Sequence, residues 1–365
     1  MLMDNNIKRT FYPPTQVLLG VIAVGFLLYI GQEIIVPLIF GLIIAILLNP
    51  LVKKMHSKGI NRTVAILLAV TLAFLCTAGL VYFIGSQASM FAEALPQLKQ
   101  RLTSLLNDAI NWVSLNFNVS TRRINEWLQK QQSEGLSHTP EVIGQTLTTI
   151  TGVLVMIFLI PIYIFLFLFY KPLLLEFISM QFSEAKHHTV AEVLAESKTM
   201  IQSYLIGLLT QAGIVAILLS VALFILGIDY ALLLGVIGAL LNIIPYVGVF
   251  VATILPMLIA LATKEPIYAL YVFIAYTIVQ FIDNNFIVPR VVASKVQINA
   301  LISVIAVLIG GSLWGVPGMF LSLPLTAILK VICDRVEPLK PLGFLIGDTM
   351  PPIGKIFFKG KKKKV

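Results

Sequence analysis

Four polar side chains stand close together in an otherwise apolar segment in the last third of the chain. They are Tyr276, Gln280, Asp283 and Asn284. On a helix, residues three or four positions apart lie on the same side, so these four would form one polar face. A carboxylate at membrane depth is costly and usually marks an ion pathway or a proton relay. We therefore predict that Asp283, together with Gln280 and Asn284, binds a coupling ion or proton.

A purely structural role for Asp283 is the alternative. Its carboxylate could pair with Arg290, which follows two helical turns later, or it could meet water at the membrane interface. Neither role would involve ion movement across the membrane.

Sequence motifs for other kinds of chemistry are absent. The chain has no GxxxxGK(S/T) phosphate loop and no GxSxG, HExxH or kinase signature. Its four histidines fall in predicted loops, and the adjacent His187 and His188 do not share a helix face. Cys76 and Cys333 form no CxxC pair. We predict no enzymatic activity, no metal site and no cofactor.

The composition indicates where these residues act. Of the 365 residues, 58% are hydrophobic and only 12% are charged. Soluble proteins carry roughly a quarter charged residues, so an ordinary soluble fold is excluded and an integral membrane protein is indicated. The net charge of +9 then concerns orientation in the lipid bilayer, and we predict no nucleic-acid partner.

Six apolar segments are long enough to cross a bilayer, because about 20 helical residues span the hydrocarbon core. They are residues 14–30, 34–51, 63–85, 147–170, 204–226 and 267–285. Two further apolar segments, 231–262 and 298–332, are interrupted by proline and glycine at 244–248 and 310–318. Each flank has about 12 to 14 residues, or about 21 Å at most, which is too short to cross comfortably. We interpret both as re-entrant helical hairpins; two kinked pairs of full spans are the alternative.

The predicted fold is therefore an all-α polytopic membrane protein with eight hydrophobic segments, namely six full spans and two Pro/Gly-broken re-entrant hairpins. With the N-terminus inside, 20 of the 26 basic residues fall in cytoplasmic segments. This bias predicts that both termini are cytoplasmic.

Five regions follow from this topology. Residues 1–86 hold the first three spans, and 87–146 form an extracytoplasmic amphipathic helical segment. Residues 147–202 hold the fourth span and a linker helix, 203–335 form the transport core, and 336–365 form a basic cytoplasmic tail. The outer segment could be a cap or an oligomer contact, or it could lie along the membrane surface.

The core has an inverted arrangement. The fifth span runs outward and precedes one hairpin, whereas the sixth runs inward and precedes the other. Such interrupted segments in corresponding positions point to the binding site of a transporter, and their half-helix N-termini suit anionic or polar groups. The candidate solute-binding residues are Asn242, Pro245, Tyr246, Gly248, Gly311, Ser312, Trp314 and Gly318.

The same residues resemble a known family, the autoinducer-2 exporter family of bacterial permease-like proteins. The residues that carry the resemblance are Ile244-Pro245-Tyr246-Val247-Gly248; Gln280, Asp283, Asn284 and Pro289; Gly310, Gly311, Gly315, Gly318, Met319, Pro324 and Leu325; and Pro37 with Asn49-Pro50. The resemblance covers nearly the whole chain. It implies that the protein lies in the inner (cytoplasmic) membrane of a bacterium. It implies a homo-oligomer, with a pentamer as the implied assembly and the outer helical segment at its contacts. In the family the acidic position is commonly glutamate, and here it is Asp283.

Three functions are compatible with the sequence. The leading hypothesis is a secondary transporter that exports a small polar or anionic solute, such as the quorum-sensing signal autoinducer-2, with coupling to protons or cations. The family also includes cation/proton antiporters, so a Na⁺(K⁺)/H⁺ antiporter is the second hypothesis. A non-transporting membrane scaffold is the third. The expected partners are the solute, the coupling ion, the lipid bilayer and further copies of the chain.

Overall fold

The computed structural model of the protein describes residues 14–117, 158–244, 247–291 and 298–348. Within these ranges the regular structure is helical, apart from one isolated β-bridge between Ile298 and Gly347. The elements in chain order are α1 (Pro14–Ile30), α2 (Gln32–Ser57), α3 (Arg62–Phe117), the unlabelled helix Phe158–Phe169, α6 (Lys171–Met180), α7 (Glu184–Ile225), α8 (Ala231–Asn242), α9 (Val247–Thr263), α10 (Ile267–Ile282), the π-helix η1 (Asp283–Ile287), α11 (Val288–Val291), α12 (Ala300–Arg335), the 3₁₀ turn η3 (Glu337–Leu339) and α13 (Lys340–Ile346).

Several of these helices can cross a membrane by length and composition. Five qualify in the described part of the chain, or six if the bent pair Phe158–Phe169 and Lys171–Met180 counts as one span. Large apolar side chains cover the outside, for example Phe224 at 79% exposed and Phe250 at 72%. Such a surface suits lipid rather than water, because soluble proteins rarely expose large contiguous apolar patches. The all-α, polytopic prediction is confirmed, and residues 147–157 of the predicted fourth span lie outside the described ranges.

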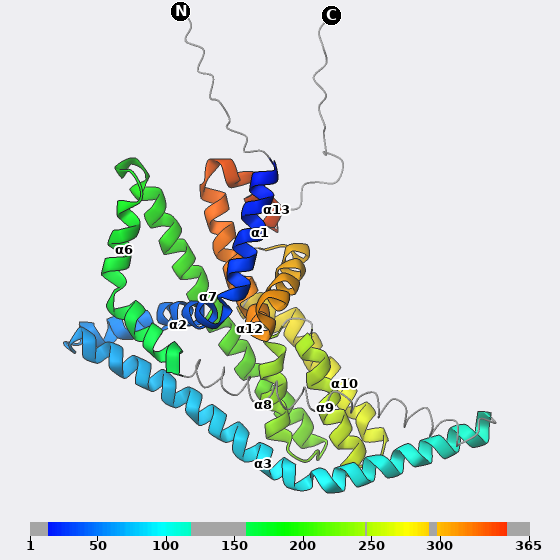
Figure 1. Cartoon of the computed structure of the whole chain (residues 1–365). Coiled ribbons are helices and arrows are strands. Elements are labelled where there is room, and N and C mark those ends of the chain that lie inside the picture. Colours follow the sequence, from blue (N-terminus) through cyan, green and yellow to red (C-terminus); the bar gives the residue numbers. More distant parts are fainter. Residues whose placement is uncertain (1–13, 118–157, 245–246, 292–297, 349–365) are drawn as a thin grey trace, which may run out of the picture.

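Two predicted spans continue into the segments next to them. The third extends through α3 to Phe117 without a break, a helix of about 84 Å at 1.5 Å per residue. Figure 1 shows α3 passing beneath α8, bending, and extending beyond the other helices in its last part; Pro96 lies within it. The fifth span and the predicted linker helix likewise form one helix, α7. Glycine and proline pairs are absent at both junctions, so local sequence gives the backbone no reason to stop.

The first interrupted segment forms two helices, α8 and α9, that fold back on each other. Gly248 lies so close to Leu241 that a Cβ on the glycine would overlap the Leu241 carbonyl group. Only a residue without a side chain allows this close approach of two backbones. Pro245 and Tyr246, at the tip, lie outside the described residues.

The second interrupted segment is broken inside α12. Trp314 and Gly315 leave the helical conformation, and Gly315 has a φ of +61°, which favours glycine. On either side of the break, Gly310 and Gly318 touch through their backbones, and a Cβ on either would overlap the other's carbonyl. The chain therefore reverses at Trp314 and Gly315.

The second arms of the two broken segments are longer than predicted. Helix α9 has 17 residues, and residues 316–335 of α12 extend for about 30 Å at 1.5 Å per residue. The expected flanks of 12 to 14 residues were too short in these two cases, because both arms begin inside the predicted breaks, at Val247 and directly after Gly315. The second arm of α12 has the length of a full span.

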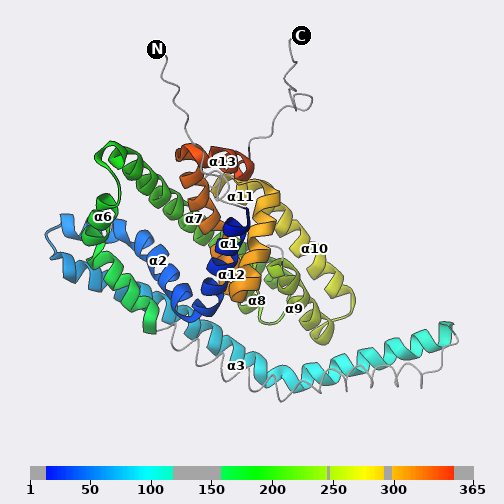
Figure 2. The same cartoon turned by 45° about the horizontal axis from the view of Figure 1, so that its top comes forward.

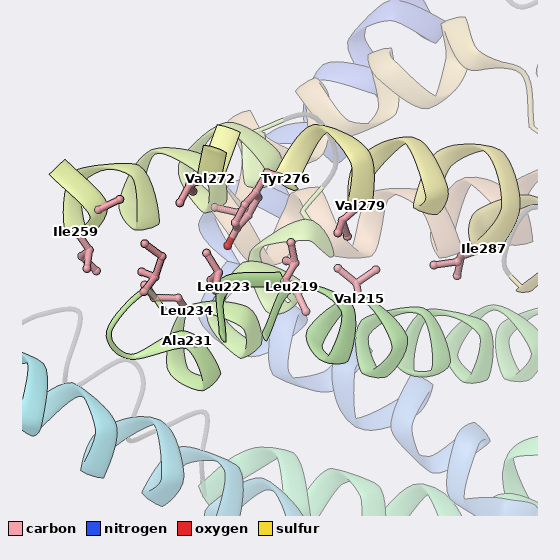
Figure 3. Close-up of a cluster of buried hydrophobic side chains, with 14 residues drawn as sticks. Val215, Leu219, Leu223, Ala231, Leu234, Ile259, Val272, Tyr276, Val279 and Ile287 are labelled. Carbon is pink, nitrogen blue, oxygen red and sulfur yellow. The ribbon is translucent and has the colours of Figure 1, made fainter. Parts of the chain in front are cut away.

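Helix α7 lies at the centre of the packing. One buried cluster joins it to α8, α9, α10 and η1 through residues that include Leu219, Leu223, Leu234 and Val272 (Figure 3). A second cluster joins α7 to α2 and α12. Because α7 belongs to both clusters, it holds the first broken segment and the second in one unit.

The end of α12 is tied down by polar contacts. Arg335 donates to Glu192 and Glu196 of α7 at 2.6 and 2.9 Å. Asn299 caps α12 by accepting from the Ile302 amide at 2.9 Å, and its Nδ2 donates to backbone carbonyls of residues 345–347. Helix α13 therefore packs against α12, as Figure 2 shows, and the chain beyond Arg335 begins as ordered structure.

Candidate functional site

Asp283 is the most deeply buried charged side chain that the structure describes, with 1% of its surface exposed. Two side-chain amides bind its carboxylate. Gln211 Nε2 donates to Oδ1 at 3.1 Å and to Oδ2 at 2.9 Å, and Asn242 Nδ2 donates to Oδ2 at 2.8 Å. The carboxylate thus accepts hydrogen bonds from two helices at once, α7 and the end of α8.

The local backbone explains how Asp283 reaches this position. Helix α10 widens into the π-helix η1 at Asp283, and the Val288 amide donates to the Asp283 carbonyl. Pro289 follows immediately and has no amide to donate, which weakens the ordinary helical pattern at this point. Such widened turns occur frequently at functional sites. The turn directs Asp283 towards α7 and leaves the next residue, Asn284, on the exposed surface.

Asp283 does not pair with Arg290. The Arg290 guanidinium lies over the Phe286 ring instead, 5.8 Å from its centre. Within the described residues, no ion pair to Asp283 is present, so neutral amides alone hold the carboxylate. A buried charge without a cation is costly even when it is hydrogen-bonded. Of the two structural roles, the ion pair is excluded, and the burial of Asp283 also argues against simple hydration at an interface.

A small pocket lies beside this carboxylate. Its polar lining comes from Asn242, Tyr276 and Gln280, and its apolar lining comes from Val215, Leu219, Gly238, Val249, Ala252 and Val279. The space open to the centre of a water molecule is about 10 Å³, so the pocket has room for about one water molecule.

The Tyr276 hydroxyl is buried at this pocket without a hydrogen-bond partner. Figure 3 shows the side chain reaching from α10 towards Leu219 and Leu223 of α7. An unpaired buried hydroxyl is unfavourable by roughly 1–3 kcal/mol. A polar guest in the pocket would relieve this cost.

The other predicted coupling residues are also near η1. Gln280 Nε2 donates to Asn284 Oδ1 at 3.2 Å, and Gln280 lines the pocket, whereas Asn284 is exposed. The structure therefore brings Asn242, Gln280 and Asp283 together. Asn284 is joined to them only through Gln280.

The predicted solute-binding residues of the second hairpin are engaged elsewhere. Ser312 donates to the Ile309 carbonyl at 2.8 Å, and Trp314 Nε1 donates to the Leu28 carbonyl of α1 at 2.9 Å. Gly311 faces the Met319 side chain, and Gly318 faces Gly310. None of these four contacts Asp283 through any hydrogen bond that the structure describes.

Residues next to the two breaks nevertheless pack against the same buried cluster. Ile243, next to Asn242, and Trp314 both pack against the buried cluster formed by α2, α7 and α12. Leu205 and Leu208 of α7 belong to that cluster and lie within two turns of Gln211. Residues beside both breaks therefore pack against the same buried cluster.

Gln211 is the site residue that sequence reasoning missed. It lies 72 positions from Asp283 and is 9% exposed. The available signal was its type, because a glutamine is unusual within the apolar segment 204–226.

Comparisons with known proteins agree with the sequence resemblance. The profile of the family described as AI-2E family transporter matches residues 18–337. A Haemophilus influenzae protein, whose name gives a provisional transport role, is 27% identical over 354 residues, which cover 95% of this chain and 99% of the relative. YhhT of Escherichia coli strain K12, also named provisionally for transport, is 26% identical over 330 residues, covering 89% and 91%.

A third relative has a more specific name. The AI-2 transport protein TqsA of Escherichia coli strain K12 is 25% identical over 322 residues, which cover 87% of this chain and 90% of TqsA. The matches extend along almost the full length of each protein and include the elements that hold Asp283. Proteins of this kind are transport proteins and not enzymes. The chain belongs to the AI-2E transporter family.

Proposed function

We propose that this protein is a secondary transporter that exports a small polar or anionic solute and couples export to a proton or cation at Asp283. The observation that carries the proposal is the buried carboxylate, held by Gln211 of α7 and Asn242 of α8 without a cation. In this proposal a coupling proton or cation binds at the carboxylate, because an isolated charge is costly at membrane depth.

The hydrogen bonds link that charge to a moving part. Bonds to an ionised group are roughly twice as strong as bonds between neutral groups, so protonation of Asp283 weakens the bond from Asn242. Asn242 is the last residue of α8, directly before the break of the first hairpin. Protonation would therefore loosen the hairpin from α7 and η1, whereas ionisation would hold it in place.

The solute would enter the same region. The pocket beside Asn242, Tyr276 and Gln280 has room for about one water molecule, so a larger solute needs the hairpin to move first. TqsA is named as an AI-2 transport protein, so a signal of that kind is our first candidate solute.

A Na⁺(K⁺)/H⁺ antiporter is less well supported. Ion antiporters usually bury more than one carboxylate, and Asp283 is the only buried acidic residue within the described ranges. A scaffold without transport gives no reason for an unpaired carboxylate at this depth.

Two variants test the proposal. Cells that express the wild type, Asp283→Asn or the exposed control Asp229→Asn are compared by their extracellular and intracellular metabolites. We expect one solute to leave wild-type and Asp229→Asn cells and to accumulate with Asp283→Asn. In proteoliposomes that contain the wild type, a proton gradient should raise the transport rate of the same solute. With Asp283→Asn, the transport rate should be the same with and without the gradient.

Three results would decide against parts of the proposal. Identical metabolite profiles from equally abundant proteins would reject export of a solute. Transport that responds to the gradient even in Asp283→Asn would reject coupling at this carboxylate. A pH change on adding Na⁺ to proteoliposomes that lack any other solute would favour the antiporter.

A further inference from the structure

Four basic side chains from four elements lie in the region where the end of α2 and the starts of α3 and α6 come together. They are Lys53 of α2, Arg62 of α3, Lys171 of α6 and Lys198 of α7, here called the basic cluster. The first contact that builds it is between Lys171 Nζ and Asn49 Oδ1, at 3.2 Å. Lys53 follows Asn49 by four residues on the same helix, so both lie on the face that meets Lys171.

Hydrogen bonds to backbone carbonyls hold the segments that carry the other two members. Arg62 Nη2 donates to the carbonyls of Leu168 and Phe169 at 2.9 and 3.1 Å, two residues before Lys171. Gln202, four residues after Lys198, donates to the Ile46 carbonyl of α2 at 2.6 Å. In Figures 1 and 2 the start of α6 accordingly lies beside the end of α2 and the start of α3.

No carboxylate compensates the basic cluster among the described residues. Other basic side chains do have acidic partners, as Lys330, Arg335 and Lys340 show. Burial lowers the pKa of the Lys171 amine, and the charges of the other three members lower it further. Four like charges repel one another, so an anion bound among them would lower this repulsion.

The surroundings indicate which anion this is. The cluster lies where α2 ends, α3 begins and the helix Phe158–Phe169 ends, which is the boundary of several candidate spans. Helix α6 continues from it with Leu173, Phe177 and Met180 exposed by 59% or more. This arrangement fits a lipid, because the phosphate group of a lipid could contact the basic cluster while its acyl chains cover the neighbouring apolar surface.

We propose that Lys53, Arg62, Lys171 and Lys198 bind the phosphate group of an anionic phospholipid. By the positive-inside prediction, this lipid belongs to the cytoplasmic leaflet. The bound lipid joins α2, α3, α6 and α7 at one point and neutralises their mutual repulsion. This inference concerns a site apart from Asp283 and stands whether or not the protein transports a solute.

The test uses the purified full chain and its affinity for phosphatidylglycerol, measured by native mass spectrometry. Lys53→Gln/Lys198→Gln removes two charges of the basic cluster. Lys54→Gln/Lys186→Gln removes two charges from the same helices at exposed positions outside it. We expect the Kd to rise roughly 30-fold in the first variant, from the usual contribution of each cation near an anionic lipid, and to change little in the second.

Further arms separate the lipid from other anions and from loss of folding. Phosphatidylcholine should bind weakly to all variants, and inorganic phosphate should not displace phosphatidylglycerol. Equal losses in both double variants, or displacement by inorganic phosphate at equal concentration, would overturn the proposal. Because Lys53 is exposed, Lys53→Gln alone provides a folded variant, and an unchanged Kd in it and in Lys198→Gln alone would also overturn the proposal.

Discussion

At the scale of residues, the site consists of one negative charge that is hydrogen-bonded by two uncharged side-chain amides. Asp283 accepts three contacts from Gln211 and Asn242, and none of them supplies a positive charge. The three hydrogen bonds stabilise the buried carboxylate, whereas its charge has no ion-pair partner among the described residues. Replacing aspartate by a longer glutamate would move the charge by one methylene towards α7.

The first prediction concerns Gln211. Gln211→Leu removes the donor to both carboxylate oxygens and leaves part of a buried carboxylate without partners, which should lower the free energy of unfolding by about 1–3 kcal/mol. Denaturant unfolding of the purified protein in detergent measures this. The matched control is Thr210→Val, an adjacent exposed residue on α7, which should change stability by about 0.5 kcal/mol or less. Equal effects in both variants would show that Gln211 does not stabilise Asp283.

A second prediction at this scale concerns Tyr276. Its hydroxyl has no hydrogen-bond partner among the described residues, so Tyr276→Phe should leave the free energy of unfolding unchanged or raise it. If the hydroxyl contacts the solute, the same change should raise the KM for export. An unaltered KM together with unaltered stability would remove Tyr276 from the binding site.

At the scale of elements, glycine contacts close both broken segments. Gly248 meets the Leu241 carbonyl, and Gly310 meets Gly318, although the two breaks differ in sequence and in the length of their arms. Backbone groups fill the space in each case, so a neighbouring side chain cannot rotate away to admit a methyl group. The glycines at these positions therefore allow the backbone to approach itself where the chain reverses.

The third prediction follows from this geometry. Gly318→Ala forces a Cβ into the Gly310 carbonyl and should destabilise the protein by about 1–3 kcal/mol, with loss of transport. Gly213→Ala is the control, since the space around that glycine on α7 is open. Thermal unfolding and export are measured for both. Full activity in Gly318→Ala would contradict the hairpin reversal at Trp314 and Gly315.

At the scale of the whole molecule, α7 organises both halves of the core, and α3 extends beyond it. The extension of α3 is amphipathic only in part, since Ile110 is buried whereas Leu106 is 58% exposed. Its exposed residues leave room for contact with other copies of the chain, the homo-oligomer implied by the family resemblance. The basic cluster lies at the opposite end of α3, at its start.

The fourth prediction is the orientation of the chain. We expect both termini in the cytoplasm and the end of α3 outside, because the basic residues concentrate on one side. Reporter fusions after Phe117 and at each terminus, read out by activities confined to one side of the membrane, measure this directly. A cytoplasmic signal from the fusion after Phe117 would reverse the topology and would place the basic cluster in the outer leaflet.

The sequence by itself determined the class of the protein, its apolar helices, its two breaks and its family. Each of these depends on neighbours along the chain. Hydropathy accumulates over about 20 successive residues, and proline and glycine act on their own backbone. The importance of Asp283 could also be inferred, because a carboxylate in an apolar segment is costly wherever the helix lies.

Only the tertiary structure decided what Asp283 touches. Its partners, Gln211 and Asn242, lie 72 and 41 positions away and are brought to it by the packing of α7 and α8 against α10. The rejected pairing with Arg290 was two turns along the same helix and therefore looked plausible from spacing alone. The basic cluster likewise joins four separate elements. Contacts of this kind depend on how apolar helix faces fit together, and local spacing carries no information about that fit.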